Sequence, residues 1–398
     1  MSEKNLIPEL RFPAFEKDGE WTVSSIDKLC DILNNIRKPV TSTNRTAGPY
    51  PYYGASGIID FIDKFLFDER LLLIGEDGAK WGAYDNTAFL VEGKYWVNNH
   101  AHVLKPIGID EKLLESYLVK LDLNPYITGA APPKLTLRKL KEIPVPVPST
   151  PEEQQKIASC LSSLDELIAA HNDKLDALKD HKKGLLQNLF PQEGETVPKV
   201  RFPEFEDDGD WVEKKLGQIG VPLMCKRIFK DQTTPNSENR IPFYKIGTFG
   251  KEPDSYIAPE LYKEFKSKYN FPKKGDILIS ASGTIGRLVV YDGEPAYFQD
   301  SNIVWLGHSE KEVSNDFLYY CYSIVNWQTS DGGVIKRLYN SDLKAISIKF
   351  PENEKEQKKI ASCLSAVDEL ITAQQQKIEE LQLHKKGLMQ GLFPKIES

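Results

Sequence analysis

The sequence predicts an α+β protein with a pseudo-two-fold internal repeat: two domains with mixed, mostly β cores, joined by two long helices that form an antiparallel coiled coil. Two repeated segments predict this fold. The segment 150–191 recurs as 353–394 without an insertion. The motif RFPAF at 11–15 recurs as RFPEF at 201–205, and an acidic stretch and a tryptophan follow both copies. The segments between the repeats differ from each other, and each has a length typical of one domain.

The repeats divide the chain into four parts. A chain of 398 residues is longer than one hydrophobic core usually supports, so at least two domains are expected. We place a first domain at 1–148, a first helix at 149–191, a linker with the second domain at 192–350, and a second helix at 351–398. Because the joints recur while the domains diverge, the two domains are predicted to recognise different things.

Both long helices carry a heptad pattern. Their apolar residues are spaced alternately by four and three positions, which is typical of two helices that wind around each other along a narrow seam. The predicted seam residues are Ile157, Leu161, Leu164, Ile168, His171, Leu175, Leu178, Leu185 and Leu189 in the first helix, and Ile360, Leu364, Val367, Ile371, Gln374, Ile378, Leu381, Leu388 and Leu392 in the second.

Polar residues interrupt the seam at matching places. His171 and Gln374 share one heptad position, and Lys182 and Lys385 share another. A polar seam residue costs stability but fixes the register and orientation of the helices. In an antiparallel coiled coil, His171 and Gln374 would lie near each other at the centre. The alternative is that each helix packs only on its own domain.

The ends of the two helices also agree. Thr150 and Asn353 are N-cap residues, followed three positions later by Glu153 and Glu356, which is the spacing of a capping box. Both helices end at a Phe-Pro pair, because proline cannot continue a helix without the loss of a hydrogen bond.

Each domain shows strand-like runs that are separated by glycine, asparagine and aspartate. The first domain has predicted strands at 71–74, 88–91 and 96–104 and a helix at 111–121. The second has strands at 276–280, 288–291 and 301–306 and a helix at 316–327. Both domains end in a short strand, at 143–148 and 346–351, and Pro144 and Pro146 favour an edge position for the first of these.

The repeat order also predicts where the ends of the chain lie. The first helix leads directly into the second RFPEF motif, whereas the second helix is the last repeated element. A pseudo-two-fold molecule then requires the C-terminus to lie close to the N-terminal motif. We therefore expect the protein to tolerate circular permutation.

Composition indicates a cytoplasmic protein without a membrane partner. No apolar run approaches the ~20 residues that span a bilayer, and the N-terminal sequence does not lead into a signal peptide. The five cysteines show no CxxC spacing and are expected to be reduced, with Cys160 and Cys363 packed as small apolar residues. A net charge of −7 argues against a protein that coats nucleic acid through bulk charge, but it allows local basic faces.

The sequence contains no complete motif for catalysis. The sequence NPYI at 124–127 lacks the second proline of an adenine methyltransferase motif and is interpreted as a turn. No GxxxxGK[ST] phosphate loop occurs. His100 and His102 lie on one face of a predicted strand, but no third metal ligand is suggested, so we expect hydrogen-bonding or contact roles and no metal site.

The remaining candidates are basic and aromatic residues in predicted loops. Arginine and lysine bind phosphates and guanine edges, although any one of them is more often only a solvated surface residue. The candidate DNA-binding residues are Arg37, Lys38, Arg45, Tyr53, Lys80, Trp81, Lys134 and Arg138 in the first domain, and Lys226, Arg227, Lys230, Lys245, Lys266, Arg287, Lys336 and Arg337 in the second.

Nearly the whole chain resembles the specificity subunit of type I restriction-modification systems. The resemblance rests on HKKGLLQNLFP and HKKGLMQGLFP, on EQQKIASCLSSLDELI and EQKKIASCLSAVDELI, and on the twin RFPxF motifs. Inside the domains, YPYYGASGIIDFID, LIGEDGA and KYWVNNHAHVL look like one known type of target-recognition domain. GDILISASGTIGR and AYFQDSNIVWL look like another.

The resemblance implies a DNA reader that is not itself an enzyme. Two target-recognition domains would each bind half of a split, asymmetric site in double-stranded DNA, with the coiled coil as a ruler. Two methyltransferase subunits would dock on the helices and two restriction subunits would join them. S-adenosylmethionine, ATP and Mg would bind the partner subunits, so no cofactor is expected on this chain. A helix from Ile157 to Leu189 spans ~50 Å, longer than the ~34 Å of one DNA turn.

Glycines interrupt both helices at matching positions, Gly184 and Gly387. Glycine inside a helix costs ~1 kcal/mol relative to alanine. We therefore expect these glycines to allow close approach of another backbone, either the partner helix or a methyltransferase subunit.

Two other classes of function stay open at this point. One is a cryptic adenine methyltransferase, which binding of S-adenosylmethionine by the isolated chain would favour. The other is a coiled-coil adaptor that binds protein and not DNA. A steep fall of DNA affinity with salt would argue against the adaptor, because release of counterions marks phosphate contact.

Overall fold

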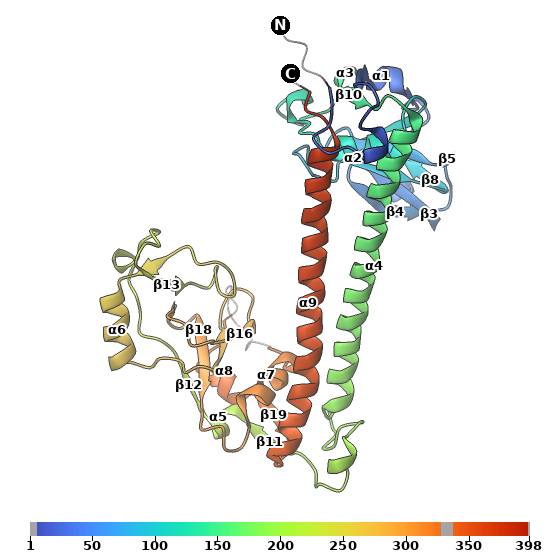
Figure 1. Ribbon diagram of the computed structural model, residues 1–398. Coiled ribbons are helices and arrows are strands. Elements are labelled where there is room, and N and C mark those ends of the chain that lie inside the picture. Colours follow the sequence, from blue (N-terminus) through green and yellow to red (C-terminus); the bar gives the residue numbers. More distant parts are fainter. Residues whose placement is uncertain (1–5, 328–336, 397–398) are drawn as a thin grey trace. The chain divides into compact units, whose positions relative to one another are not determined.

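The computed structural model describes residues 6–327 and 337–396. The chain divides into two compact units. The first unit comprises Met1–Lys174 and Gln374–Ser398, and the second comprises Leu175–Ala373. Each unit therefore contains one domain and parts of both long helices, which lie side by side in Figure 1.

The first domain contains two four-stranded sheets and one two-stranded sheet. Their strand orders are β2-β9-β6-β7, β4-β3-β8-β5 and β1-β10. In chain order its elements are β1 (Thr22–Ser25), α1 (Ile26–Leu29), β2 (Cys30–Ile32), β3 (Ala47–Gly54), β4 (Gly57–Ile62), β5 (Phe67–Asp68), β6 (Leu71–Gly75), β7 (Ala88–Val91), β8 (Lys94–Val97), β9 (Ala101–Pro106), α2 (Glu111–Lys120), α3 (Leu137–Glu142) and β10 (Pro144–Val147).

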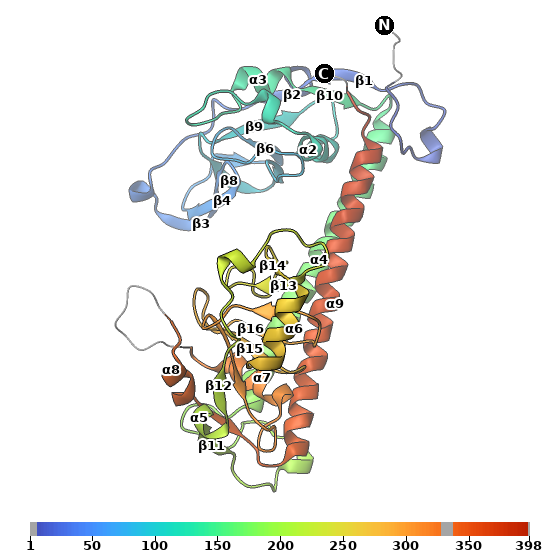
Figure 2. The ribbon, with the colours of Figure 1, turned by 90° about the vertical axis from the view of Figure 1, so that its left-hand side faces the viewer.

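Strand β6 is buried on both of its faces. Leu72 and Ile74 belong to the core that α2 and the long helices cover, whereas Leu71 and Leu73 belong to the core shared with the other four-stranded sheet. Alternate residues of a strand point to opposite faces, so one continuous apolar run serves two cores. Figure 2 shows β6 and β9 beside α2.

The second domain repeats this plan with a different sequence. Its sheets have the orders β12-β18-β15-β16, β14-β13-β17 and β11-β19. Its elements are β11 (Val212–Lys215), α5 (Leu216–Ile219), β12 (Val221–Leu223), β13 (Ile241–Tyr244), β14 (Tyr256–Ile257), α6 (Pro259–Lys268), β15 (Ile277–Ser280), β16 (Leu288–Val290), β17 (Tyr297–Phe298), β18 (Ile303–Gly307), α7 (Asn315–Ile324), α8 (Asn340–Ala345) and β19 (Ser347–Phe350).

The two long helices are α4 (Pro151–Leu189) and α9 (Glu354–Leu392), and they pack together. Within the first unit the N-terminal part of α4 lies beside the C-terminal part of α9, so the helices are antiparallel. The Gln374 amide donates hydrogen bonds of 2.7 Å to His171 Nδ1 and to the His171 carbonyl oxygen. The predicted pairing at the centre of the seam is therefore confirmed.

The seam lysines have acidic partners on the opposite helix, Asp368 and Asp165, which occupy equivalent positions in the two copies of the repeat. Lys182 pairs with Asp368 at 2.6 Å in the second unit, and Lys385 pairs with Asp165 in the first. Asp165 also pairs with Lys112 of α2 at 2.7 Å. Burial raises the pKa of Asp165, but the hydrogen bonds from these two lysines prevail and lower it below its ordinary value. The lysine positions therefore tie the helices together and are not simply polar interruptions.

The predicted capping boxes are wrong in one respect. The Glu153 backbone N–H does donate to the Thr150 hydroxyl, at 3.3 Å. The Glu153 carboxylate, however, accepts hydrogen bonds of 2.7 and 2.8 Å from Arg11 of the RFPAF motif and one of 3.3 Å from Trp21. A bidentate charged pair is stronger than a return bond to a neutral backbone N–H, so the carboxylate joins motif to helix.

The second unit builds the same clasp. Arg201 donates to Glu356 at 2.8 and 2.7 Å, and Trp211 donates to the same carboxylate at 3.3 Å. We call these two arrangements the clasps. Both are buried, since the arginine side chains are 6% and 7% exposed and the glutamates 1% and 0%.

The two ends of the described chain lie together, as the repeat requires. The Leu10 N–H donates to the Gly391 carbonyl at 2.8 Å, and Leu6 and Ile396 pack on the same core. In the second unit the Val200 N–H donates to the Asn188 carbonyl at 2.9 Å, at the corresponding positions of the repeat. The predicted proximity is confirmed, and tolerance of circular permutation stays a prediction.

Most predicted strands and helices are present, with two differences. The predicted strand 96–104 is two strands, β8 and β9, because residues 98–100 form a turn between them. The predicted helix 316–327 ends earlier, at Ile324, because Val325 is extended. Among the residues that the structure describes, strand β10 pairs with β1 alone, which confirms its edge position.

Two further observations concern helices and thiols. In the described residues, no helix is long and apolar enough to cross a membrane. All five cysteines are free, and burial raises the pKa of Cys30 and of Cys225 to about 12, so both stay protonated near neutral pH.

Candidate nucleic-acid interface

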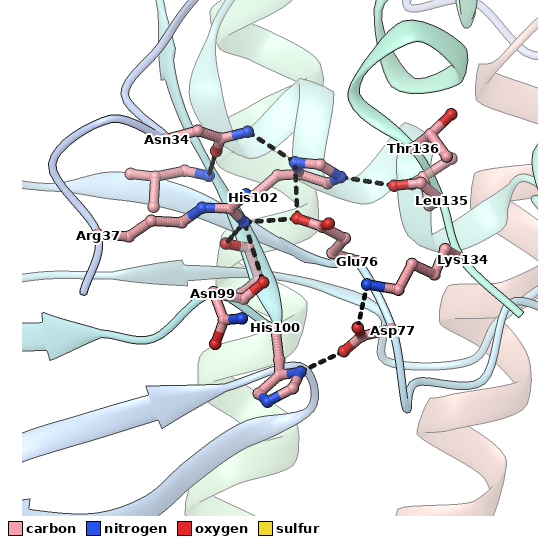
Figure 3. Close-up of polar contacts among 12 residues, drawn as sticks. Asn34, Arg37, Glu76, Asp77, Asn99, His100, His102, Lys134, Leu135 and Thr136 are labelled. Atoms are coloured by element: carbon pink, nitrogen blue, oxygen red, sulfur yellow. Dashed lines mark hydrogen bonds and ion pairs between the residues drawn. The ribbon is translucent and has the colours of Figure 1, made fainter. Parts of the chain in front are cut away.

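Three loops of the first domain meet at the ends of β6 and β9 (Figure 3). The loop after β6 begins at Glu76, the turn before β9 ends at His100, and the third segment precedes α3. The Glu76 N–H donates to the His100 carbonyl and the Leu135 N–H donates to the Glu76 carbonyl, both at 2.8 Å. Glu76 therefore fixes the other two loops through its backbone.

A buried polar layer lies beneath these loops. Arg37 Nη1 lies 2.6 Å from Glu76 Oε2 in an ion pair whose angles are not those of a hydrogen bond. The same nitrogen donates to the carbonyls of Asn99 and Ala101 at 3.3 and 2.8 Å. Arg37 is only 15% exposed, so its charge is used mainly inside the domain.

His102 is fully buried and its tautomer follows from its partners. Nε2 lies 2.6 Å from the Leu135 carbonyl, which can only accept, so Nε2 carries the proton. Nδ1 then accepts from the Asn34 amide at 2.8 Å, and the Asn34 oxygen accepts from the Val103 N–H at 3.0 Å. Burial lowers the pKa of His102, which keeps the ring neutral.

This burial predicts a pH dependence of stability. The unfolded chain protonates His102 near pH 6.5, whereas the folded protein does so only at lower pH. Below about pH 6.5 the unfolded state therefore binds more protons, and the free energy of unfolding falls as the pH falls. Urea denaturation of the wild type and His102→Gln between pH 7.5 and 5.5 should show the steeper loss in the wild type. Equal slopes would contradict this role of His102.

A second layer lies above the first, with exposed His100 and Lys134 side chains around the buried Asp77 carboxylate. Asp77 accepts from Lys134 at 2.8 Å and pairs with His100 Nδ1. Burial raises the pKa of Asp77, but the hydrogen bonds from Lys134 and His100 outweigh it and lower the pKa below its ordinary value. The His100 and Lys134 side chains are 51% and 40% exposed, so their remaining donors face solvent. These groups can bind an acceptor from outside.

Several other candidate DNA-binding residues make contacts inside the domains. Trp81 is buried and donates to the Gly75 carbonyl at 3.3 Å, and Tyr53 packs on Phe89 and Tyr95. Arg287 donates to the Phe249 carbonyl at 2.8 Å, which fixes the loop after β15. These contacts are sufficient structural reasons for the residues.

Most of the remaining candidates are exposed. Three of them, Lys38, Lys80 and Lys230, are exposed. Others form ion pairs: Arg45 with Asp60, Arg227 with Asp300 and Lys245 with Asp254, while Arg138 lies 3.7 Å from Glu142. The rest contact rings or backbone: Arg45 stacks over Tyr52, Lys226 over Tyr269 and Lys266 over Tyr262 and Phe271, and Arg337 donates to the Ser301 carbonyl. Lys336 lies outside the described residues.

Sequence reasoning missed Asn34, Glu76 and Asp77. Their signal was weak, since a short EDG turn after an apolar strand occurs in many proteins. In the described residues, no three His, Cys, Asp or Glu side chains are grouped so that they could hold a metal ion. The two histidines have hydrogen-bonding roles, and they lie in different layers.

The chain is similar to specificity subunits in sequence. It matches the family model of the type I restriction modification DNA specificity domain over residues 18–180 and 208–383. A putative type I restriction enzyme specificity subunit of Haemophilus influenzae is 41% identical over 358 residues, which are 89% of each chain. The MjaVIII specificity subunit of Methanocaldococcus jannaschii is 26% identical over 94% of this chain and 92% of that one.

Solved structures share the fold. The specificity subunit from M. genitalium covers 98% of this chain and 100% of its own, with a TM-score of 0.65 at 17% identity. A chain from a structure described as complex assembly and conformational transition of the type I R-M system covers 94% of this chain and 97% of its own, with a TM-score of 0.52 at 16% identity.

Proposed function

This chain belongs to the family of type I restriction-modification specificity subunits, which are not catalytic, and from that membership we propose that its two domains each read one half of a split, asymmetric DNA site. The observation that carries the proposal is the pair of clasps. Two unlike domains are attached to the same two helices by the same contacts, Arg11–Glu153–Trp21 and Arg201–Glu356–Trp211. Equivalent attachment with unlike domains suits a site whose halves differ in sequence.

The coiled coil would set the gap between the half-sites. Helices of 39 residues are ~58 Å long, which exceeds one turn of DNA. The His171–Gln374 hydrogen bonds and the lysine–aspartate pairs hold the register of the helices. A fixed register favours a fixed gap. Two methyltransferase subunits would dock on the helices and two restriction subunits would complete the complex, with S-adenosylmethionine, ATP and Mg on those partners.

The salt dependence of DNA affinity distinguishes a DNA-binding subunit from a protein adaptor. The complex of this chain with its methyltransferase subunits would be titrated with duplex DNA at several salt concentrations. A DNA reader loses affinity steeply as salt rises, because its basic side chains displace counterions from phosphates. An adaptor would bind DNA weakly or not at all while it still formed the protein complex.

The structure distinguishes between the two contacts expected for the helix glycines, the partner helix and a methyltransferase subunit. Beyond the adjacent backbone of its own helix, a Cβ added at Gly184 or Gly387 would meet no atom of the described residues within 4 Å, so close approach of the partner helix is wrong as the explanation. We propose that a methyltransferase subunit contacts these positions.

Alanine at both glycines should therefore have opposite effects on the chain and on its assembly. The free energy of unfolding of the chain should rise by up to about 1 kcal/mol per site, because alanine is the better helix former. Binding of the methyltransferase subunit, measured by titration calorimetry, should weaken. Gln375→Ala, at an exposed helical position, is the control. A stabilised chain with unchanged assembly would remove this role.

A further inference from the structure

We propose that base discrimination is concentrated in two groups of three side chains, which occupy the same backbone positions in the two domains. This inference rests on the proposed function and adds the residues that make the half-sites different. The first trio is Asp77, His100 and Lys134; the second trio is Ser282, Asn302 and Arg337.

Backbone hydrogen bonds show that the two trios correspond. In the first domain the Glu76 N–H donates to the His100 carbonyl at 2.8 Å, and in the second the Ala281 N–H donates to the Asn302 carbonyl at 2.7 Å. The next residue along each loop, Asp77 or Ser282, therefore occupies the same place.

The third member of each trio corresponds in the same way. The Leu135 N–H donates to the Glu76 carbonyl, and the Leu338 N–H donates to the Ala281 carbonyl, both at 2.8 Å. Isolated β-bridges join Asp77 to Lys134 and Ser282 to Arg337. A glycine in the left-handed region follows each loop position, Gly78 with φ of 73° and Gly283 with φ of 64°. These backbone features are shared, whereas the side chains at the trio positions differ.

Polar contacts hold the side chains of each trio, within the trio or to an adjacent backbone carbonyl. Asp77 pairs with both His100 and Lys134, whereas Ser282 lies 2.9 Å from the Asn302 oxygen and Arg337 donates to the Ser301 carbonyl at 2.7 Å. These contacts hold each outward donor in one orientation. Preorganised side chains lose less conformational entropy when they bind.

The chemistry offered to solvent differs between the trios. The first presents imidazole and ammonium donors around a carboxylate, and the second presents an amide, a hydroxyl and a guanidinium. Asparagine suits adenine and arginine suits guanine, while histidine and lysine donate to purine or phosphate acceptors. Different donor and acceptor sets on one scaffold are what two different half-sites require.

A comparison of the buried layers in the two domains indicates that the trios are not needed to hold the loops together. Its members Glu76 and His102 are replaced in the second domain by Ala281 and Val304, so apolar packing can support the same loops. The backbone junction therefore does not depend on a particular polar set. All three members of the second trio are partly exposed, as are His100 and Lys134 of the first.

Grafting the second trio onto the first domain tests the inference. The variant Asp77→Ser, His100→Asn, Lys134→Arg would be co-expressed with the methyltransferase subunit in a methylation-free host, and methylated sites mapped across the genome. One half-site should change at one or more positions, with preference shifted by roughly 5- to 150-fold, while the other half-site and the gap stay the same. An unchanged motif at unchanged thermal stability would overturn the inference.

Controls separate the other outcomes. Lys105→Arg with Glu69→Gln alters another exposed ion pair at the opposite end of β9 and should leave both half-sites unchanged. If the graft does not fold, His100→Asn alone, at a half-exposed side chain, replaces it. For Lys134→Ala, an equal fall in affinity for cognate and scrambled DNA would show a phosphate contact only and overturn base reading by Lys134. If the wild type methylated no split motif, that result would contradict the proposed function and not the trio inference alone.

Discussion

Glu356→Ala is expected to lower the free energy of unfolding of the second unit by about 3–5 kcal/mol, because it leaves the buried Arg201 guanidinium without its partner. Arg201 donates two hydrogen bonds to that carboxylate and others to the carbonyls of Asp208 and Gly209. The hydrogen bond to Glu356 raises the pKa of Arg201 further, so the arginine cannot escape by losing its proton. Trp211 would lose its acceptor as well.

Urea denaturation of the isolated chain measures this loss. The control is the double variant Arg201→Met with Glu356→Leu, which removes both charges and should cost less than Glu356→Ala alone. Glu153→Ala in the first unit should behave like Glu356→Ala, since its clasp is equally buried. If the single variant were as stable as the wild type, the clasps would not hold the domains to the helices.

Phe393→Ala is expected to destabilise the first unit by about 3–5 kcal/mol, as for other large-to-small changes at buried aromatic residues. Phe393 is 1% exposed and lies against Trp21 and Tyr117, with ring centroids 6.4 and 5.6 Å away. It thus attaches the end of α9 to the first domain. Phe190 has the same place in the second unit, against Trp211 and Phe317.

The matched control lies on α9, the helix that Phe393 follows. Leu383 is 71% exposed, so Leu383→Ala should change the free energy of unfolding by no more than about 0.5 kcal/mol. Thermal and urea denaturation of both variants, followed by tryptophan fluorescence, gives the comparison. Similar losses for the two variants would mean that the end of α9 is not part of the first core.

The helices and most strands were predictable because their signal is local. Heptad spacing requires only the order of apolar residues, and it correctly paired His171 with Gln374. The predicted strand across 96–104 failed because the strand-like pattern continues through residues 98–100, where the backbone turns. Local propensity does not show which partner the backbone groups of such a turn will find.

The clasps and the trios depend on contacts between distant segments. Glu153 has the spacing of a capping residue, and only the folded position of Arg11 decides that its carboxylate binds elsewhere. The trios share no residue type, so residue identity at these positions does not reveal their equivalence. Their equivalence lies in backbone hydrogen bonds, such as those of Glu76 and Ala281, which exist only after folding.

The most direct test of the two-reader account is a map of methylated adenines. The wild-type chain would be co-expressed with its methyltransferase subunit in a methylation-free host, and modified adenines located across the genome. Two domains that read different half-sites at a fixed separation should give one motif in two unlike parts, separated by a fixed gap of unspecified bases. Methylation at an undivided motif, or at half-sites with variable gaps, would contradict it.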